Sequence, residues 1–129
     1  MPATEVRVFR TASGEIPLIS WLRHTKASEP DAYKKCLQRI LLLEENGNAL
    51  RRPHADYLRD GVYELRCRLG KVHYRILYGF TGKCIATLTS GFTKEGEVPD
   101  KEIDLAIERL ALVKSNPTKF TADFEATDL

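Results

Sequence analysis

The feature that most constrains the fold is a pair of alternating segments on either side of Gly70-Lys71. Val62–Leu69 and Val72–Phe80 each alternate along the chain, the pattern of strands that turn one face toward a core. A two-residue Gly-X connection between such segments is typical of a tight β-hairpin. The residues expected to face the core are Tyr63, Leu65, Cys67, Leu69, Val72, Tyr74, Ile76 and Tyr78.

A two-residue turn also predicts which residues meet on the other face of the hairpin. Arg66 then lies opposite Arg75, and Arg68 lies opposite His73. Like charges in direct cross-strand contact are destabilising unless something compensates them, and Glu64 on the same face neutralises only part of this charge. The pattern therefore predicts an exposed phosphate-binding surface. The alternative is that the arginines reach solvent or pair with distant acids.

The remaining segments predict helices packed against this sheet. We expect a short strand at Glu5–Arg10 and a short helix at Pro17–His24. A longer helix starts at a capping-box-like Ser28, with Pro30 in its first turn, and ends at Asn46-Gly47. A third central strand at Cys84–Phe92 and a last helix at Pro99–Ser115 complete the order β-α-α-β-β-β-α. This order predicts the α+β class.

Length and composition favour one domain, residues 1–115, followed by an acidic tail, residues 116–129. The tail either packs over the basic part of the chain or is disordered. No apolar run is long enough for a membrane helix and no signal-peptide pattern is present, so we expect a cytoplasmic protein without a membrane partner. The three cysteines lack metal-ligand spacing and are expected to be reduced and buried, and no metal or cofactor is predicted.

Positive charge is concentrated in the middle of the chain. From Arg51 to Arg75 there are seven Lys or Arg residues and three acids, with His54 and His73 in addition. A basic band of this kind favours a polyanionic partner, although a solvated surface of mixed charge is the simpler alternative.

Four stretches together resemble the RelE/ParE toxin superfamily, and within it the phage-derived HigB-like branch. They are residues 58–66 (LRDGVYELR), 74–78 (YRILY), 91–94 (GFTK) and 99–103 (PDKEI). The resemblance covers about Val6 to Leu112 and includes the order of the elements. It implies a RelE-like antiparallel sheet packed against helices.

The same resemblance implies the toxin of a type II toxin–antitoxin pair, a ribosome-dependent mRNA endoribonuclease (mRNA interferase) that enters the ribosomal A site and inhibits translation. In the implied metal-free reaction a ribose 2′-hydroxyl is deprotonated and attacks the neighbouring phosphorus, and a 5′-hydroxyl leaves. Such a reaction needs cations near the developing charge and groups that transfer protons. The resemblance implies mRNA, the ribosome and a helix-turn-helix antitoxin as partners. By position the implied catalytic residues are Arg66, Arg75, Lys94 and His54, and the implied RNA-binding residues are Arg51, Arg52, Arg68, Lys71 and His73.

The sequence departs from the family pattern near its C-terminal end. Some relatives carry a catalytic Tyr or His there, whereas this chain has no Tyr after Tyr78 and no His after His73. Residues 93–100 are also less basic than is usual in the branch. Two alternatives therefore stay open: a non-catalytic protein that binds RNA or a partner on the same fold, and a gyrase-inhibiting ParE-like toxin, against which the two strand arginines argue.

Overall fold

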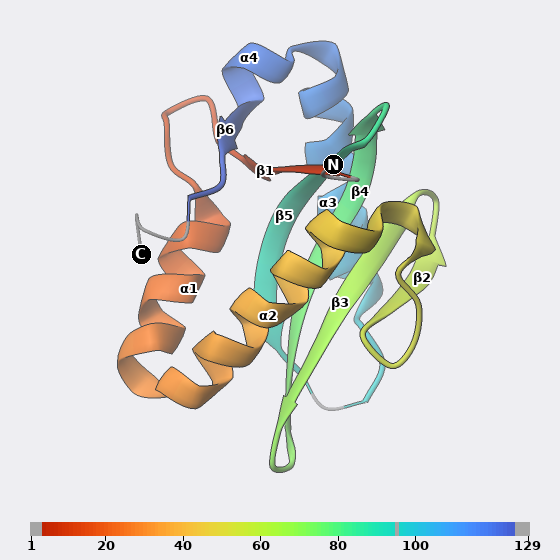
Figure 1. The fold of residues 1–129 in the computed structure, drawn as a ribbon. Coiled ribbons are helices and arrows are strands. Elements are labelled where there is room, and N and C mark those ends of the chain that lie inside the picture. The colour runs from red at the N-terminus through yellow and green to blue at the C-terminus, as the bar shows by residue number, and fades with distance from the viewer. Residues whose placement is uncertain (1–3, 95, 126–129) are drawn as a thin grey trace.

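A six-stranded sheet runs through the protein in the order β2-β3-β4-β5-β1-β6 (Figure 1). The computed structural model describes residues 4–94 and 96–125. Neighbouring strands pair antiparallel except β1 and β5, which are parallel. The α+β class with a mostly antiparallel sheet is therefore confirmed. The strands are β1 (Glu5–Phe9), β2 (Ala55–Arg59), β3 (Val62–Leu69), β4 (Val72–Gly82), β5 (Ile85–Thr93) and β6 (Thr121–Asp123).

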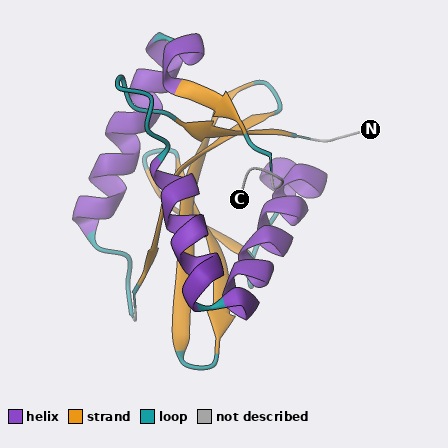
Figure 2. Cartoon of the chain, turned by 90° about the vertical axis from the view of Figure 1, so that its left-hand side faces the viewer, coloured by secondary structure: helices purple, strands orange, loops and turns teal. Residues whose placement is uncertain are grey.

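Helices cover both faces of the sheet, as the turned view in Figure 2 shows. On one face lie α1 (Pro17–Ser28) and α2 (Pro30–Asn46), the latter followed by a short 3-10 turn, η1 (Gly47–Ala49). On the other face lies α3 (Asp100–Ser115). Between α1, α2 and the sheet is the larger core, with Leu18, Leu22, Cys36, Ile40, Leu65, Ile76 and Tyr78 among its buried residues. Under α3 is a smaller core of Val62, Leu77, Ile103, Ala106 and Leu110.

The β3–β4 hairpin has the predicted register. Arg66 pairs with Arg75 and Arg68 pairs with His73 across the two strands. Gly70 adopts a φ of 62°, a conformation that glycine reaches without steric cost, and this closes the two-residue turn. The prediction that the hairpin's apolar set faces the core is confirmed for Leu65, Cys67, Tyr74, Ile76 and Tyr78.

The start of α2 differs from the prediction. Ser28 is the last residue of α1, where its hydroxyl donates to the carbonyl of His24, so it does not cap α2. Glu29 occupies the cap position without a side-chain capping bond, while Pro30 begins the helix as expected. The capping-box prediction was wrong because the first helix continues four residues beyond His24 and uses Ser28 itself.

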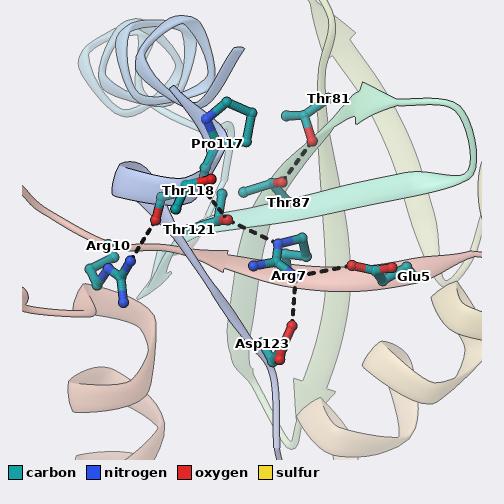
Figure 3. A network of polar contacts seen from close by, with 9 residues as sticks. All are labelled: Glu5, Arg7, Arg10, Thr81, Thr87, Pro117, Thr118, Thr121 and Asp123. Carbon is teal, nitrogen blue, oxygen red and sulfur yellow. Dashed lines mark hydrogen bonds and ion pairs between the residues drawn. The ribbon is translucent and has the colours of Figure 1, made fainter. Parts of the chain in front are cut away.

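Residues expected to form a tail join the sheet instead. A short helix, α4 (Pro117–Phe120), leads into β6, which pairs with β1 at the sheet edge farthest from β2. Arg7 joins the two strands: its guanidinium donates to Thr121 at 2.9 Å and to Asp123 at 2.6 Å (Figure 3). Residues 116–125 therefore neither lie over the basic band nor lack structure, and the last four residues of the predicted tail lie outside the described part.

Candidate functional site: two pockets that share Arg66

Two pockets adjoin each other around the middle of β3. The first, which we call the central pocket, has a volume of about 450 Å³ and lies among β2, β3, β4 and the start of α3. The second, which we call the arginine pocket, has a volume of about 360 Å³. Both are lined by Arg52 and Arg66, so they form one continuous region. The arginine pocket is lined by Arg39, Arg52, Pro53, Arg66, Cys67, Arg68 and His73.

Arg66 has a fixed backbone and an available side chain. Its N–H donates to the carbonyl of His54 at 2.8 Å, and its carbonyl accepts from Nε of Arg39 at 3.0 Å. The side chain is half-buried and makes no hydrogen bond or ion pair with residues 4–94 or 96–125. The guanidinium of Arg66 is therefore placed at the junction of the two pockets and can bind an anion.

Arg75 lies opposite Arg66 but is not exposed, as had been expected. Only 6% of the residue is accessible, and its Nη1 forms an ion pair of 2.5 Å with Glu64, itself 4% exposed. The other guanidinium nitrogens donate to the carbonyls of Lys94 and Gly96. The prediction of two arginines side by side on an open sheet was wrong for Arg75, because Glu64 and the segment after β5 together satisfy it and cover it.

Lys94 and His54 do not reach either pocket with their side chains. Lys94 is exposed. Its backbone carbonyl accepts from Arg75, and its backbone N–H donates to the backbone carbonyl of His73. His54 is half-buried and its Nδ1 is buried without a hydrogen-bond partner in the described part of the chain. These two residues therefore line neither pocket, although the carbonyl of His54 holds the Arg66 backbone.

Two of the expected RNA-binding residues also lie apart. Nη1 of Arg51 donates to the carbonyls of Asn48 and Leu50, so this side chain stabilises its own loop. Lys71 is exposed in the hairpin turn and lines neither pocket. The structure instead brings Arg52, Arg68 and His73 together with Arg66.

Arg39 is the residue of the site that sequence reasoning missed. It was not among the expected site residues, yet its guanidinium reaches the edge of β3 and it lines the arginine pocket. Its position depends on how α2 crosses β3, which no sequence pattern indicates. With Arg39 the arginine pocket has four guanidinium groups and an imidazole, and none of its described lining residues is acidic. Such a pocket attracts anions, because guanidinium groups stay charged and bind oxyanions through two N–H donors.

The central pocket has a different electrostatic character. Its four arginines, including Arg59 and Arg75, are matched by four acids, Asp56, Glu64, Glu97 and Asp100. Arg52 donates twice to Asp56, and this hydrogen bond lowers the pKa of the Asp56 carboxyl. The positive potential of the region is therefore concentrated in the arginine pocket.

Tyr57 is an exposed aromatic residue at the edge of the central pocket. It is 53% exposed, and its hydroxyl accepts from the N–H of Gly61 at 3.1 Å. Its ring packs edge-on against Tyr63 with the centroids 4.9 Å apart. Both ends of the side chain are thus held while part of the ring stays accessible.

The fold and the site define a small α+β protein with a RelE-like sheet and a basic pocket at its centre. The sequence profile of the family described as "Phage derived protein Gp49-like (DUF891)" matches residues 23–111. The chain belongs to this family, which is related to the RelE/HigB toxin superfamily. No curated protein matches the chain.

Two further features are absent from the described residues. None of their helices is both long and apolar enough to cross a membrane. No group of three or more His, Cys, Asp or Glu side chains in those residues is arranged to hold a metal ion.

Proposed function

We propose that this protein is the toxin of a type II toxin–antitoxin pair and cleaves mRNA on the ribosome in the cytoplasm. The observation that carries the proposal is the arginine pocket, which is lined by four arginines and by no acidic residue among those described. One of the four, Arg52, is paired with Asp56 in the adjoining central pocket. Membership of a family related to the RelE/HigB toxins supports it. In this proposal a helix-turn-helix antitoxin keeps the protein inactive until it is removed.

In the proposed reaction the scissile phosphate binds at the junction of the two pockets, against Arg66. The ribose 2′-oxygen loses its proton, bonds to the neighbouring phosphorus and displaces the 5′-oxygen, which leaves as a hydroxyl after taking a proton. Negative charge builds on the phosphorus oxygens in the transition state, and preorganised cations stabilise that charge. Arg66 supplies this stabilisation, and Arg39 and Arg68 bind adjacent phosphate oxygens in the same pocket.

His73 is the proposed proton-transfer residue. It lines the arginine pocket on the same sheet face as Arg66, whereas His54 and Lys94 line neither pocket. An imidazole is suited to the role, since its ordinary pKa lies close to neutral pH. Glu64 does not take this role in the proposal, because its carboxylate holds Arg75 in the pocket wall.

The proposed substrate is single-stranded RNA, which can place a base on Tyr57. Unstacked bases bind exposed aromatic rings, and Tyr57 is an exposed aromatic residue at the edge of the pocket that contains Arg52 and Arg66. Double-stranded RNA hides its bases and is not expected to use this contact.

Expression in a bacterial host, followed by mapping of mRNA 5′ ends, tests the proposal. The wild-type chain should arrest growth and produce cuts at regular positions within codons of translated messages. Arg66→Ala and His73→Gln should abolish the cuts, whereas Lys83→Ala, in the exposed turn between β4 and β5, should leave them unchanged. If Arg66→Ala produces the same cuts as the wild-type chain, the assignment of the site is wrong.

A second candidate is a protein that binds RNA or a partner without cleaving it. The specific observation in its favour is that Arg75, expected to act in catalysis, is buried in an ion pair with Glu64. Growth arrest that depends on Arg66 but occurs without any mRNA cuts would favour this candidate over the nuclease.

A further inference from the structure

Two buried cysteines that the proposed function does not use lie against each other beneath the arginine pocket. Cys36 belongs to α2 and is fully buried, and Cys67 belongs to β3 and is 3% exposed. Both are free thiols in the same core, and the interaction between them raises the pKa of Cys36 and lowers the pKa of Cys67. The sequence indicated only that these residues would be buried, because they are far apart in the chain.

Two hydrogen bonds between α2 and β3 fix this arrangement from both sides. Nζ of Lys35 donates to the carbonyl of Arg68 at 3.0 Å, and Nε of Arg39 donates to the carbonyl of Arg66 at 3.0 Å. Residues four apart on a helix lie on the same side, one turn from each other. Cys36, within that turn, is thus held over Cys67, which lies between the two carbonyl-bearing residues of β3.

Cys67 is the member of the pair that lies nearer to solvent. It lines the arginine pocket, which is open to solvent, whereas Cys36 lies behind it in the core. The interaction with Cys36 and the positive charges of Arg39 and Lys35 lower the pKa of the Cys67 thiol. The same contact with Cys67, together with burial, raises the pKa of Cys36, so Cys67 is the nucleophile of the pair.

We propose that Cys36 and Cys67 form an oxidisable dithiol that a peroxide converts into a disulfide between α2 and β3. The Cys67 thiolate attacks one peroxide oxygen, the O–O bond breaks, and the sulfur becomes a sulfenic acid with release of water or an alcohol. The Cys36 thiol then attacks the sulfenic sulfur, and the second oxygen leaves as water. Two thiols are oxidised and one peroxide is reduced, so electrons and atoms balance.

The product links the elements that shape the arginine pocket. A disulfide holds two sulfurs about 2.0 Å apart, so the two buried sulfurs must shift toward each other to bond. That shift draws α2 and β3 together at the position where Arg39 holds the Arg66 backbone. The dithiol chemistry itself does not depend on the proposed nuclease function.

The test uses the full chain carrying Cys84→Ser, which removes the exposed thiol and its intermolecular reactions. The folded protein is treated with hydrogen peroxide at neutral pH, and the remaining thiols are then alkylated. Intact mass and non-reducing peptide mapping should show a loss of two hydrogens, no alkylation, and a 36–67 linked peptide that dithiothreitol removes. The thermal unfolding midpoint of the oxidised protein should rise relative to the reduced form.

Two matched variants identify the order of the steps. With Cys36→Ala, dimedone should trap a sulfenic acid on Cys67, whereas with Cys67→Ala the buried Cys36 should react at least tenfold more slowly. Circular dichroism of each variant before treatment establishes that it is folded. The proposal is overturned if folded Cys84→Ser protein accumulates sulfinic acid at Cys67 without the 36–67 link, or if both cysteines resist peroxide at concentrations that oxidise Cys84 in the wild-type chain.

Discussion

Arg66 and Arg75 face each other across β3 and β4, yet they have different electrostatic environments. Arg75 is buried and bound by Glu64 at 2.5 Å, whereas Arg66 has no ion pair or hydrogen bond from its side chain to residues that the structure describes. One carboxylate thus resolves the repulsion that two adjacent guanidinium groups would otherwise cause. The guanidinium of Arg66 stays available in the pockets. Arg75 therefore has a structural role, and Arg66 is left to bind a ligand.

Replacing Arg75 should reduce stability more than replacing Arg66. In Arg75→Met the carboxylate of Glu64 stays buried without its partner, which costs about 3–5 kcal/mol for a pair of this kind. Arg66→Met removes no comparable bond and should change the free energy of unfolding by less than about 1 kcal/mol. Urea denaturation of the two variants measures the difference.

The double variant Glu64→Leu with Arg75→Met serves as the control. Because it removes both charges and fills a similar volume with apolar groups, it should recover most of the stability lost in Arg75→Met alone. A double variant as unstable as the single one would show that the ion pair is not the reason for the loss.

Removing Arg39 should weaken RNA binding in a salt-dependent way. A guanidinium that contacts a phosphate of single-stranded RNA contributes about 0.7 to the slope of log affinity against log salt concentration. Arg39→Gln should therefore lower both the affinity and that slope, while Lys83→Ala should change neither. Fluorescence anisotropy with a short single-stranded RNA at several salt concentrations is the measurement, and an unchanged slope would remove Arg39 from the binding site.

Releasing Arg52 from its carboxylate partner should strengthen anion binding. Asp56→Asn keeps the shape of the side chain but removes the charge that pairs with Arg52, an exposed side chain that lines both pockets. We expect RNA to bind roughly two- to fivefold tighter at low salt, with little change in stability, because exposed ion pairs contribute at most about 1 kcal/mol. Weaker binding would show that Asp56 positions Arg52 productively.

The same pair makes a pH prediction. The hydrogen bond from Arg52 lowers the pKa of the Asp56 carboxyl. The carboxyl therefore stays ionised even at a pH equal to its ordinary pKa of about 3.9. Protonation, which would release Arg52, therefore occurs only at more acidic pH. The Asp56→Asn variant and the wild-type chain should consequently keep a constant ratio of RNA affinities from about pH 5 to pH 8. Binding titrations across this range would contradict the interpretation if the ratio fell toward one.

Tyr57 should contribute through its ring and not through its hydroxyl. Tyr57→Phe keeps the ring and should retain most of the affinity for single-stranded RNA, whereas Tyr57→Leu should lose about 1–3 kcal/mol, the usual contribution of a stacked base. An RNA hairpin stem should bind both variants equally. Equal losses of RNA affinity in Tyr57→Phe and Tyr57→Leu would instead assign the effect to the hydrogen bond that the Tyr57 hydroxyl accepts from Gly61.

Local sequence patterns account for the hairpin and the helices. Alternation on both sides of Gly70 specified the strands and their register, since shifting the pairing by one residue would turn every apolar side chain of one strand away from the core. The helical spacing of α2 likewise puts Tyr33, Cys36 and Ile40 on one side of the helix, and all three are buried. Strand alternation and helical spacing both depend on residues that are close together in the chain, so both can be seen in the sequence.

The binding surface was decided by contacts between residues distant in sequence. Arg66 and Arg75 have the same chemistry and mirrored positions, and only the placement of Glu64 and of the carbonyls of Lys94 and Gly96 made one of them structural. Arg39 lies at the site because α2 packs across β3 in a position that lets the Arg39 guanidinium reach the carbonyl of Arg66. Sequence by itself determined the β3–β4 hairpin, the strands β1 and β5 and the three long helices, because these follow from the periodicity of apolar residues. The edge strands β2 and β6 were not predicted. Which charges remain available for a ligand was left to the tertiary structure, because electrostatic pairing acts through space and not along the chain.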